Sequence, residues 1–150
     1  MARVTLTPIK KDPFWSMHLA GSKVQLLVQR QKHGGKDAGA ILERHGVKTF
    51  AGYYDDHKRG EIITAEREKV FVSFGGEFVR VDTGKDAYII KRGPDAPVFF
   101  VHRGGKEIGR GKVAANSAFL DTHDAALVKL APEVLVLLLF HDLPAPPPAS

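Results

Sequence analysis

The sequence predicts a mainly β protein: an antiparallel β barrel, or a strongly curved sheet, wrapped around a hydrophobic C-terminal helix. Between residues 61 and 130, short runs of β-branched and aromatic residues alternate with turn signals, at the spacing of about 8–12 residues that is typical of antiparallel strands. Residues 134–140 are apolar on every face, and this run is far shorter than the roughly 20 residues that cross a bilayer. Such a helix has to be covered on all sides, so we expect the strands to enclose it.

The first sixty residues have less regular patterns. The segments Val4–Ile9 and Lys23–Arg30 have the composition of strands. The segment Asp37–His45 predicts one short helix, with Asp37 as its N-cap and Gly46 directly after its end. The residues that would share one face of this helix are Ala38, Ile41, Leu42 and His45.

A hairpin is expected where Val70–Phe74 and Glu77–Val81 meet across two glycines, because glycine tolerates the positive φ angles of tight turns. The turn signals that follow delimit three more strands: Ala87–Lys91, Val98–His102 and Lys106–Val113. A last strand is expected at Ala125–Leu130. Pro132 would then be the first residue of the terminal helix, a position that proline favours.

Length and composition indicate a single globular domain. The 150 residues, 43% hydrophobic and 26% charged, match one soluble domain, which we expect to span residues 1–143. Residues 144–150 are rich in proline and alanine and predict a flexible tail. The absence of cysteine excludes disulfides, thiolate metal sites and thiol nucleophiles, and favours a cytoplasmic location. No apolar run is long enough for a secretory signal or a membrane anchor.

The histidines and serines form no recognised catalytic or metal-binding motif. Three of the seven histidines lie beside carboxylates, at His57, His123 and His141, but their spacing matches neither zinc nor calcium sites. No serine has the Gly-x-Ser-x-Gly setting of a hydrolase nucleophile. The sequence favours a non-enzymatic protein with no catalytic residue, metal or cofactor. An enzyme remains the less favoured alternative, because catalytic groups can converge in space from distant positions.

Positive charge is concentrated at residues 103–112, where four cations accompany the single acidic residue Glu107. The formal net charge of +5 suits an anionic membrane surface, an acidic protein or nucleic acid. We therefore expect a binding module that recognises anionic lipid headgroups or another acidic partner through the basic hairpin. The expected anion contacts are Arg103, Lys106, Arg110 and Lys112. Alternatively, the same cations prevent an exposed strand edge from pairing with another chain.

Three pieces, Gly46–Phe50, Lys58–Thr64 and Lys69–Phe74, stand in the order found in the cold-shock nucleic-acid-binding fold and resemble it. This resemblance implies single-stranded nucleic-acid binding on an OB-like sheet, where aromatic rings stack on bases. The middle piece departs from the family, because Glu61 and Ile62 stand where aromatic and small residues belong. The contacts for this alternative would be Lys48, Lys58, Arg59, Phe71 and Phe74. A third alternative is a protein-interaction module that exposes a sheet edge.

Residues 105–143 combine the basic strand Lys106–Val113, a further strand to Phe119, the turn Asp121–His123, the strand Ala125–Leu130 and the apolar helix from Pro132. This succession resembles the C-terminal part of the tubby-like fold, in particular its scramblase and LURP-one-related branch. The resemblance implies a closed antiparallel barrel threaded by a hydrophobic C-terminal helix, and a non-enzymatic module that binds anionic lipid or phosphoinositide headgroups. It carries over no site residue by residue. It also requires more strands than the patterns above supply, so the helix at 37–45 would be an insertion or a misread strand.

Overall fold

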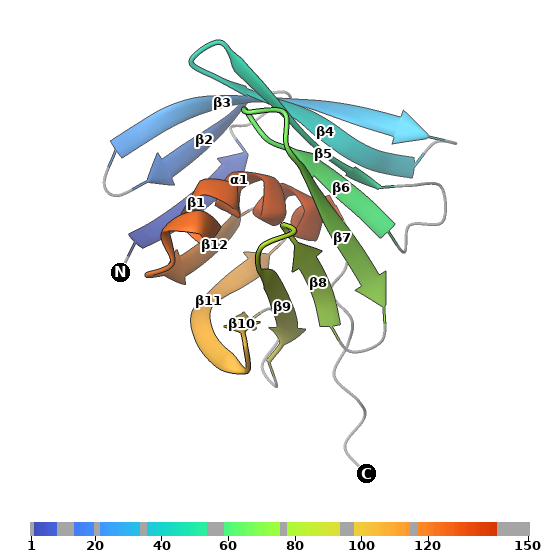
Figure 1. The fold of residues 1–150 in the computed structure, drawn as a ribbon. Coiled ribbons are helices and arrows are strands. Elements are labelled where there is room, and N and C mark those ends of the chain that lie inside the picture. The colour runs from blue at the N-terminus through green and yellow to red at the C-terminus, as the bar shows by residue number, and fades with distance from the viewer. Residues whose placement is uncertain are drawn as a thin grey trace.

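The computed structural model describes residues 2–8, 14–19, 22–33, 36–53, 59–75, 78–93, 98–114 and 117–140, and these form twelve β-strands and one α-helix. The strands follow one another along the chain and the helix comes last (Figure 1). The bounds are β1 Ala2–Pro8, β2 Phe14–Leu19, β3 Ser22–His33, β4 Lys36–Arg44, β5 Val47–Tyr53, β6 Arg59–Ile63, β7 Lys69–Gly75, β8 Phe78–Asp82, β9 Ala87–Arg92, β10 Val98–Arg103, β11 Lys106–Ala114, β12 Ser117–Thr122 and α1 Ala125–Phe140. The expected tail, residues 144–150, lies outside the described residues.

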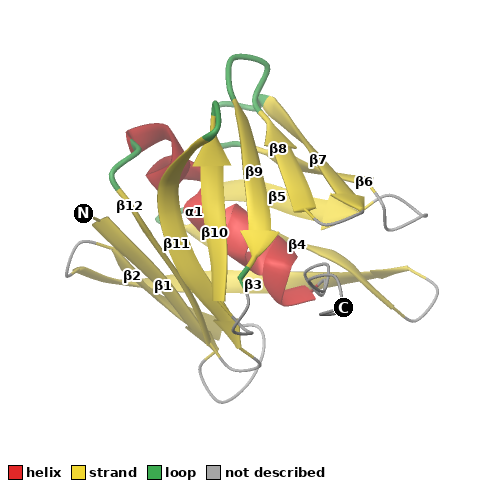
Figure 2. Ribbon diagram, turned by 90° about the horizontal axis from the view of Figure 1, so that it is seen from below, coloured by secondary structure: helices red, strands yellow, loops and turns green. Residues whose placement is uncertain are grey.

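Each strand pairs antiparallel with its neighbours in the sequence, so the sheet is one continuous meander. The first strand also pairs with the last. Val4 of β1 lies opposite Leu120 of β12, and on its other side it lies opposite Leu19 of β2. These pairs close the strand order into a barrel, and the sheet curves around α1 (Figure 2). The predicted fold class, an antiparallel barrel or curved sheet around the C-terminal helix, is confirmed.

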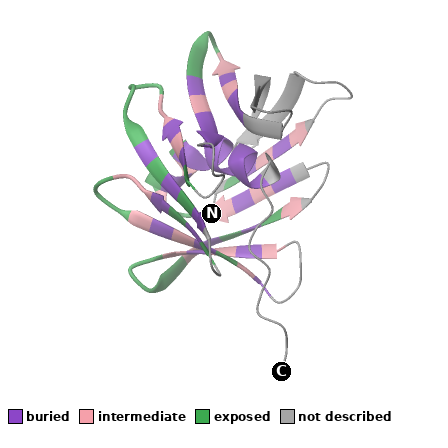
Figure 3. Cartoon of the chain, turned by 90° about the vertical axis from the view of Figure 1, so that its right-hand side faces the viewer, coloured by how far each residue is buried: buried purple, intermediate pink, exposed green. Residues whose placement is uncertain are grey.

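The side chains of α1 fill the interior of the barrel. Leu127, Leu135 and Val136 are fully buried, and residues 130–138 are buried without a break. β8 alternates exposed and buried positions, so every second residue faces the same core. Figure 3 shows buried stretches alternating with exposed or intermediate ones along the strands whose burial is described. Among the described residues, no helix combines the length and apolarity that a membrane crossing needs. Because residues 130–138 are buried inside the barrel, the apolar run is the core around which the sheet folds.

The helix begins at Ala125, and the strand predicted at Ala125–Leu130 is wrong. The carboxylate of Asp124 caps the helix, because its Oδ1 accepts a hydrogen bond from the backbone N–H of Leu127 at 2.9 Å. The buried residues of this segment recur at the helical spacing of three and four positions. Pro132 consequently lies inside α1 rather than at its start. Further along, the hydroxyl of Tyr53 on β5 donates a hydrogen bond to the carbonyl of Leu137, which ties the sheet to the helix.

The short helix predicted near residues 37–45 is also wrong, because this segment is strand β4. Its buried residues Ala40 and Leu42 alternate with half-buried Ile41, which is the period of a strand. His45 and Gly46 have φ angles of 52° and 75° and form the tight turn to β5, with Arg44 opposite Val47. The same glycine that was expected to end a helix therefore closes a hairpin. Pairing with β3 and β5 on both sides decides the conformation of a segment whose apolar residues fit either period.

The other predicted strands agree with the structure. The hairpin expected across two glycines is confirmed, with Phe74 of β7 opposite Val79 of β8. The strands expected at 87–91, 98–102 and 106–113 correspond to β9, β10 and β11. Two early strands, expected at 4–9 and 23–30, correspond to β1 and β3, whereas β2 has no counterpart among the predictions.

Candidate functional site

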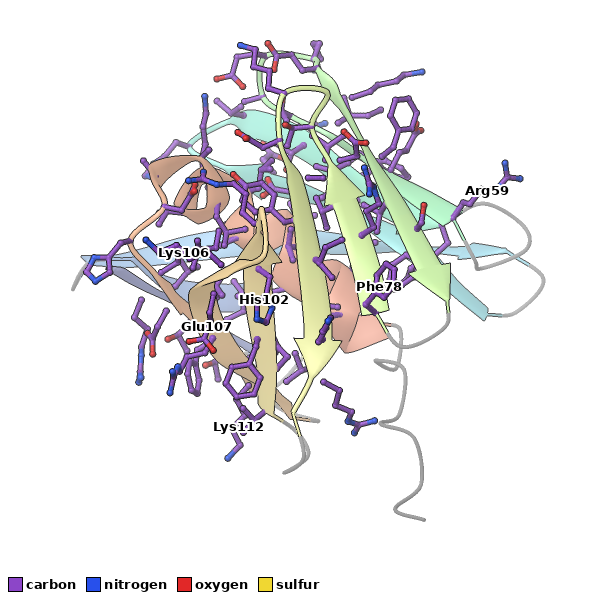
Figure 4. All side chains as sticks on the ribbon, turned by 60° about the horizontal axis from the view of Figure 1, so that its bottom comes forward. Arg59, Phe78, His102, Lys106, Glu107 and Lys112 are labelled. Carbon is purple, nitrogen blue, oxygen red and sulfur yellow. The ribbon has the colours of Figure 1, made fainter. Side chains whose placement is uncertain are left out.

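Three of the four cations expected to contact an anion line one cavity of about 400 Å³. Arg103 ends β10 and Lys106 begins β11, and a two-residue turn joins these strands. Arg110 reaches the same cavity from further along β11, whereas Lys112 lies outside it. Figure 4 shows Lys106 and Lys112 on the β11 side of the barrel, with Arg59 well away from them on the side of β6 and β7. We call this hollow the hairpin cavity.

Asp124, at the start of α1, lines the hairpin cavity and contacts several of its neighbours. The side chain of Asp124 is 7% exposed and forms an ion pair with Arg103. Its Oδ1 also accepts a hydrogen bond from the hydroxyl of Tyr88 at 3.2 Å, in addition to the bond from the backbone of Leu127. Burial, and to a lesser extent Asp124, raises the pKa of Tyr88. These contacts fix the guanidinium of Arg103, whose pKa is raised chiefly by the charge of Asp124.

Arg110 makes weaker contacts than Arg103. Its Nη2 lies 2.9 Å from Oε2 of Glu107, in a pair whose side chains are 61% and 39% exposed. Its guanidinium also lies over the ring of Phe100, 5.6 Å from the ring centre. Exposed ion pairs of this type contribute about 0–1 kcal/mol to stability, so Arg110 can exchange Glu107 for an external anion at small cost.

Lys106 and Lys112 are exposed and form no ion pair with any described carboxylate. The other two acidic residues at the hairpin cavity are engaged: Asp124 by Arg103, and Asp121 by Arg3, whose Nε and Nη2 lie 2.7 and 2.8 Å from its two carboxylate oxygens. Arg103 and Arg110 are paired with carboxylates, so among the described residues that line the cavity Lys106 is the cation without an ion-pair partner.

Strand register extends the positive charge beyond the hairpin cavity. Phe100 lies between Lys91 of β9 and Arg110 of β11, and Lys112 lies opposite Phe119 of β12. These residues face outward, because each has at least one buried neighbour along its strand, and both phenylalanines are half-buried. We call them the basic aromatic face: Lys91, Phe100, Arg110, Lys112 and Phe119. The sequence alone did not reveal Lys91 or the two phenylalanines as neighbours of the cations, since strand register brings them together.

The residues of the nucleic-acid alternative do not all lie on one surface, because Phe74 points away from the others. Lys48, Arg59 and Phe71 are exposed on β5, β6 and β7, and Phe71 is 55% exposed. Phe74 points into the barrel, where it is 5% exposed and its ring packs edge-on against Tyr53 at 5.2 Å, so it is not available to stack on a base. The strands β5 to β7 are part of the twelve-stranded barrel, not a separate small one. Lys58 lies outside the described residues.

The described residues contain no group of three or more histidines and carboxylates that could hold a metal ion. His123 lines the hairpin cavity, while His57 and His141 lie outside the described residues. No protein-family model, curated protein or solved structure matches the chain.

Proposed function

We propose that this protein is a non-enzymatic binding module that attaches to an anionic membrane surface through the hairpin cavity and the basic aromatic face. One observation carries the proposal: Arg103, Lys106 and Arg110 line a single cavity, and Lys112 continues the positive charge onto the adjoining outer surface. Phosphate oxygens of lipid headgroups are the ligands that such lysines and arginines bind best. The cytoplasmic leaflet, which carries anionic lipids, is the membrane surface we expect it to meet.

The charges available for binding are sufficient for reversible attachment. Lys91, Lys106, Arg110 and Lys112 are exposed, and among them only Arg110 is paired with a described carboxylate. A lysine or arginine near an anionic leaflet contributes about 1 kcal/mol. Four such residues would contribute on the order of 4 kcal/mol, or roughly a thousandfold in affinity. The half-buried rings of Phe100 and Phe119 lie beneath the guanidinium groups of Arg110 and Arg3, at 5.6 and 4.3 Å from the ring centres, and so support one cation of the face and one beside it.

The proposal extends to a family. A twelve-stranded antiparallel barrel with a hydrophobic C-terminal helix inside it supports assignment to the tubby-like fold, in its scramblase and LURP-one-related branch. That assignment would imply a non-enzymatic module that binds anionic lipid headgroups without a cofactor. A module that recruits a protein by adding a strand is less well supported, because each described strand already pairs with two others and leaves no free edge.

Co-sedimentation with lipid vesicles tests the membrane proposal. We expect the wild-type protein to bind phosphatidylcholine vesicles that contain phosphatidylserine, and not pure phosphatidylcholine vesicles. The double variant Lys106→Glu/Lys112→Glu should lose binding, because it reverses two unpaired charges without breaking an ion pair of the described residues. The matched control is Lys69→Glu/Lys85→Glu, which changes two exposed lysines outside the site. Each pair lowers the formal net charge by the same amount, from +5 to +1, since every substitution removes two units.

Three results would overturn the proposal. The wild type could fail to sediment with the anionic vesicles, or the two double variants could lose binding equally, which would indicate general charge attraction and no specific site. Inorganic phosphate at millimolar concentration could also displace the protein completely, which would identify a small phosphate anion and not a membrane as the ligand. All measurements should be made at one stated salt concentration, because screening weakens every surface charge.

Nucleic acid is a second candidate because Phe71, at 55% exposed, has the highest exposure among the large apolar side chains of the described residues. Lys69 is exposed on the same face of the same strand. A mobility-shift assay with a single-stranded oligonucleotide at low salt tests this candidate, with Phe71→Ala as the variant. Stacking predicts a loss of about 1–3 kcal/mol in binding free energy for this substitution. No shift with the wild type would remove the candidate.

A further inference from the structure

Glu133 is a carboxylate buried in an otherwise apolar stretch of helix. Its side chain is 3% exposed, and its neighbours Ala131, Val134 and Leu135 are all buried in the core. The described residues contain only two other buried polar or charged residues, Thr49 and Thr122, and both are neutral. A buried carboxylate is costly unless its oxygens are satisfied, so the contacts of Glu133 need an explanation.

One of the two carboxylate oxygens of Glu133 has no partner. Oε1 lies 3.9 Å from Nη1 of Arg44, and the side chain of Thr49 hydrogen-bonds to the carboxylate. Oε2 is buried and accepts no hydrogen bond from the described residues. Burial raises the pKa of Glu133, and Arg44 only partly opposes that effect. The contacts within the chain are therefore incomplete.

Glu133 borders a second cavity of about 400 Å³, which shares no residue with the hairpin cavity. Its walls come from the β6–β7 turn, the β8–β9 turn and the first turns of α1, so we call it the helix-end cavity. Four acidic residues line it, Glu66, Glu68, Asp86 and Glu133, against the three cations Arg44, Lys85 and Lys129. Lys129 is held by Glu66 at 2.8 Å, and Arg44 faces Oε1 of Glu133.

We propose that the helix-end cavity binds a small organic cation whose primary ammonium group pairs with the carboxylate of Glu133, once rotation of that side chain brings Oε2 from its buried position to the cavity. An ammonium group has three donors and no acceptor, which suits a site whose unpaired group is a carboxylate oxygen. The hydroxyl of Thr64, which also lines the cavity, accepts one hydrogen bond from the backbone N–H of Glu68 and has a second lone pair for another of these donors. A volume of about 400 Å³ lies within the range of small-molecule sites, so the ligand can carry a short alkyl chain beside Val70 and Leu130.

This proposal does not depend on membrane binding, and n-butylammonium is the probe that tests it. Isotope-labelled wild-type protein is titrated with n-butylamine at pH 7, where the amine is cationic, and amide chemical shifts are recorded. We expect saturable shifts confined to residues 64–68, 83–86 and the first turns of α1. The neutral isostere butan-1-ol at the same concentrations should cause smaller, non-saturating shifts. The variant Glu133→Gln should bind n-butylammonium at least tenfold more weakly, and the control Glu107→Gln in the hairpin cavity should bind it like the wild type.

A measurement on the unmodified protein guards against a variant that does not fold. The ¹³C signal of the Glu133 side-chain carboxyl is titrated with pH, with and without saturating n-butylammonium, and a bound ammonium should lower the apparent pKa of that group. An unchanged titration, or absence of saturable binding by the wild type, would overturn the proposal. Equal binding of butan-1-ol would also overturn it, since the cavity would then select apolar bulk and not charge. Equal binding by Glu133→Gln would place the ammonium group elsewhere.

Discussion

Replacing Leu135 by alanine is the most direct test of a barrel folded around its C-terminal helix. Leu135 is 0% exposed and lies among buried residues on both sides along α1. Substitutions of buried leucine by alanine cost about 2.7–5.0 kcal/mol, and the cost is greater where the surroundings cannot collapse into the space. Strands paired on both edges have little freedom to move inward. We therefore expect a loss of about 4 kcal/mol, a large share of the 5–15 kcal/mol that is typical of a whole domain.

Urea denaturation followed by far-ultraviolet circular dichroism measures this change. At about 2–4 °C per kcal/mol for a chain of this size, the melting temperature should fall by roughly 8–16 °C. The control Leu135→Met keeps the side-chain volume and should cost less than about 1.5 kcal/mol. A second control, Lys129→Ala, changes an exposed residue of the same helix and should alter stability by no more than about 1 kcal/mol. A loss below about 1 kcal/mol for Leu135→Ala would refute the placement of this helix face in the core.

Three further substitutions test other parts of the structure. Burial raises the pKa of Glu133 in the folded protein. The carboxyl group therefore costs no folding free energy where it is protonated in both the folded and the unfolded protein, and the cost grows as the pH rises from the unfolded pKa of about 4.3 through the raised folded pKa. We expect Glu133→Gln to stabilise the protein more at pH 7 than at pH 4 in urea titrations. An equal effect at both pH values would contradict this. In Gly111→Ala the new Cβ would lie 2.1 Å from the carbonyl oxygen of Phe119, so we expect a loss of about 3 kcal/mol by thermal denaturation, against about 1 kcal/mol for Gly46→Ala, where nothing lies within 4 Å. The reverse order would be inconsistent with the strand packing. Asp124→Ala removes the helix cap and should cost about 1–2 kcal/mol, whereas Asp124→Asn keeps a capping oxygen and should cost less; equal losses would mean that the ion pair and not the cap dominates.

Local sequence signals were sufficient for most of the fold. The strands from β7 to β11 could be predicted because each alternates buried and exposed residues over its own length and is bounded by its own turn residues. The two errors, at residues 37–45 and 125–130, fall on short segments whose apolar residues fit the period of either a helix or a strand. Their conformations are decided by β3 and β5 in the first case and by the carboxylate of Asp124 in the second.

The candidate sites were predictable in part. The charge density of residues 103–112 identified the four cations without any structure. Their contacts with Tyr88, Asp124 and Phe100 depend on strand register, which a single sequence does not specify. The helix-end cavity was missed, although Glu133 is the one acidic residue within residues 130–140. A charged residue in a helix that must be buried therefore indicates a candidate site from the sequence alone.

The pairing of β1 with β12 has a consequence for how this protein is made on the ribosome. Arg3 and Asp121, which meet across these strands, are separated by 118 positions in the chain. At ordinary rates of translation, the first strand waits on the order of ten seconds for its partner to be synthesised. The helix that forms the core emerges later still. Until then the inward faces of the strands have nothing to pack against, so the nascent chain must be kept from aggregating, and folding is completed only after the helix has left the exit tunnel.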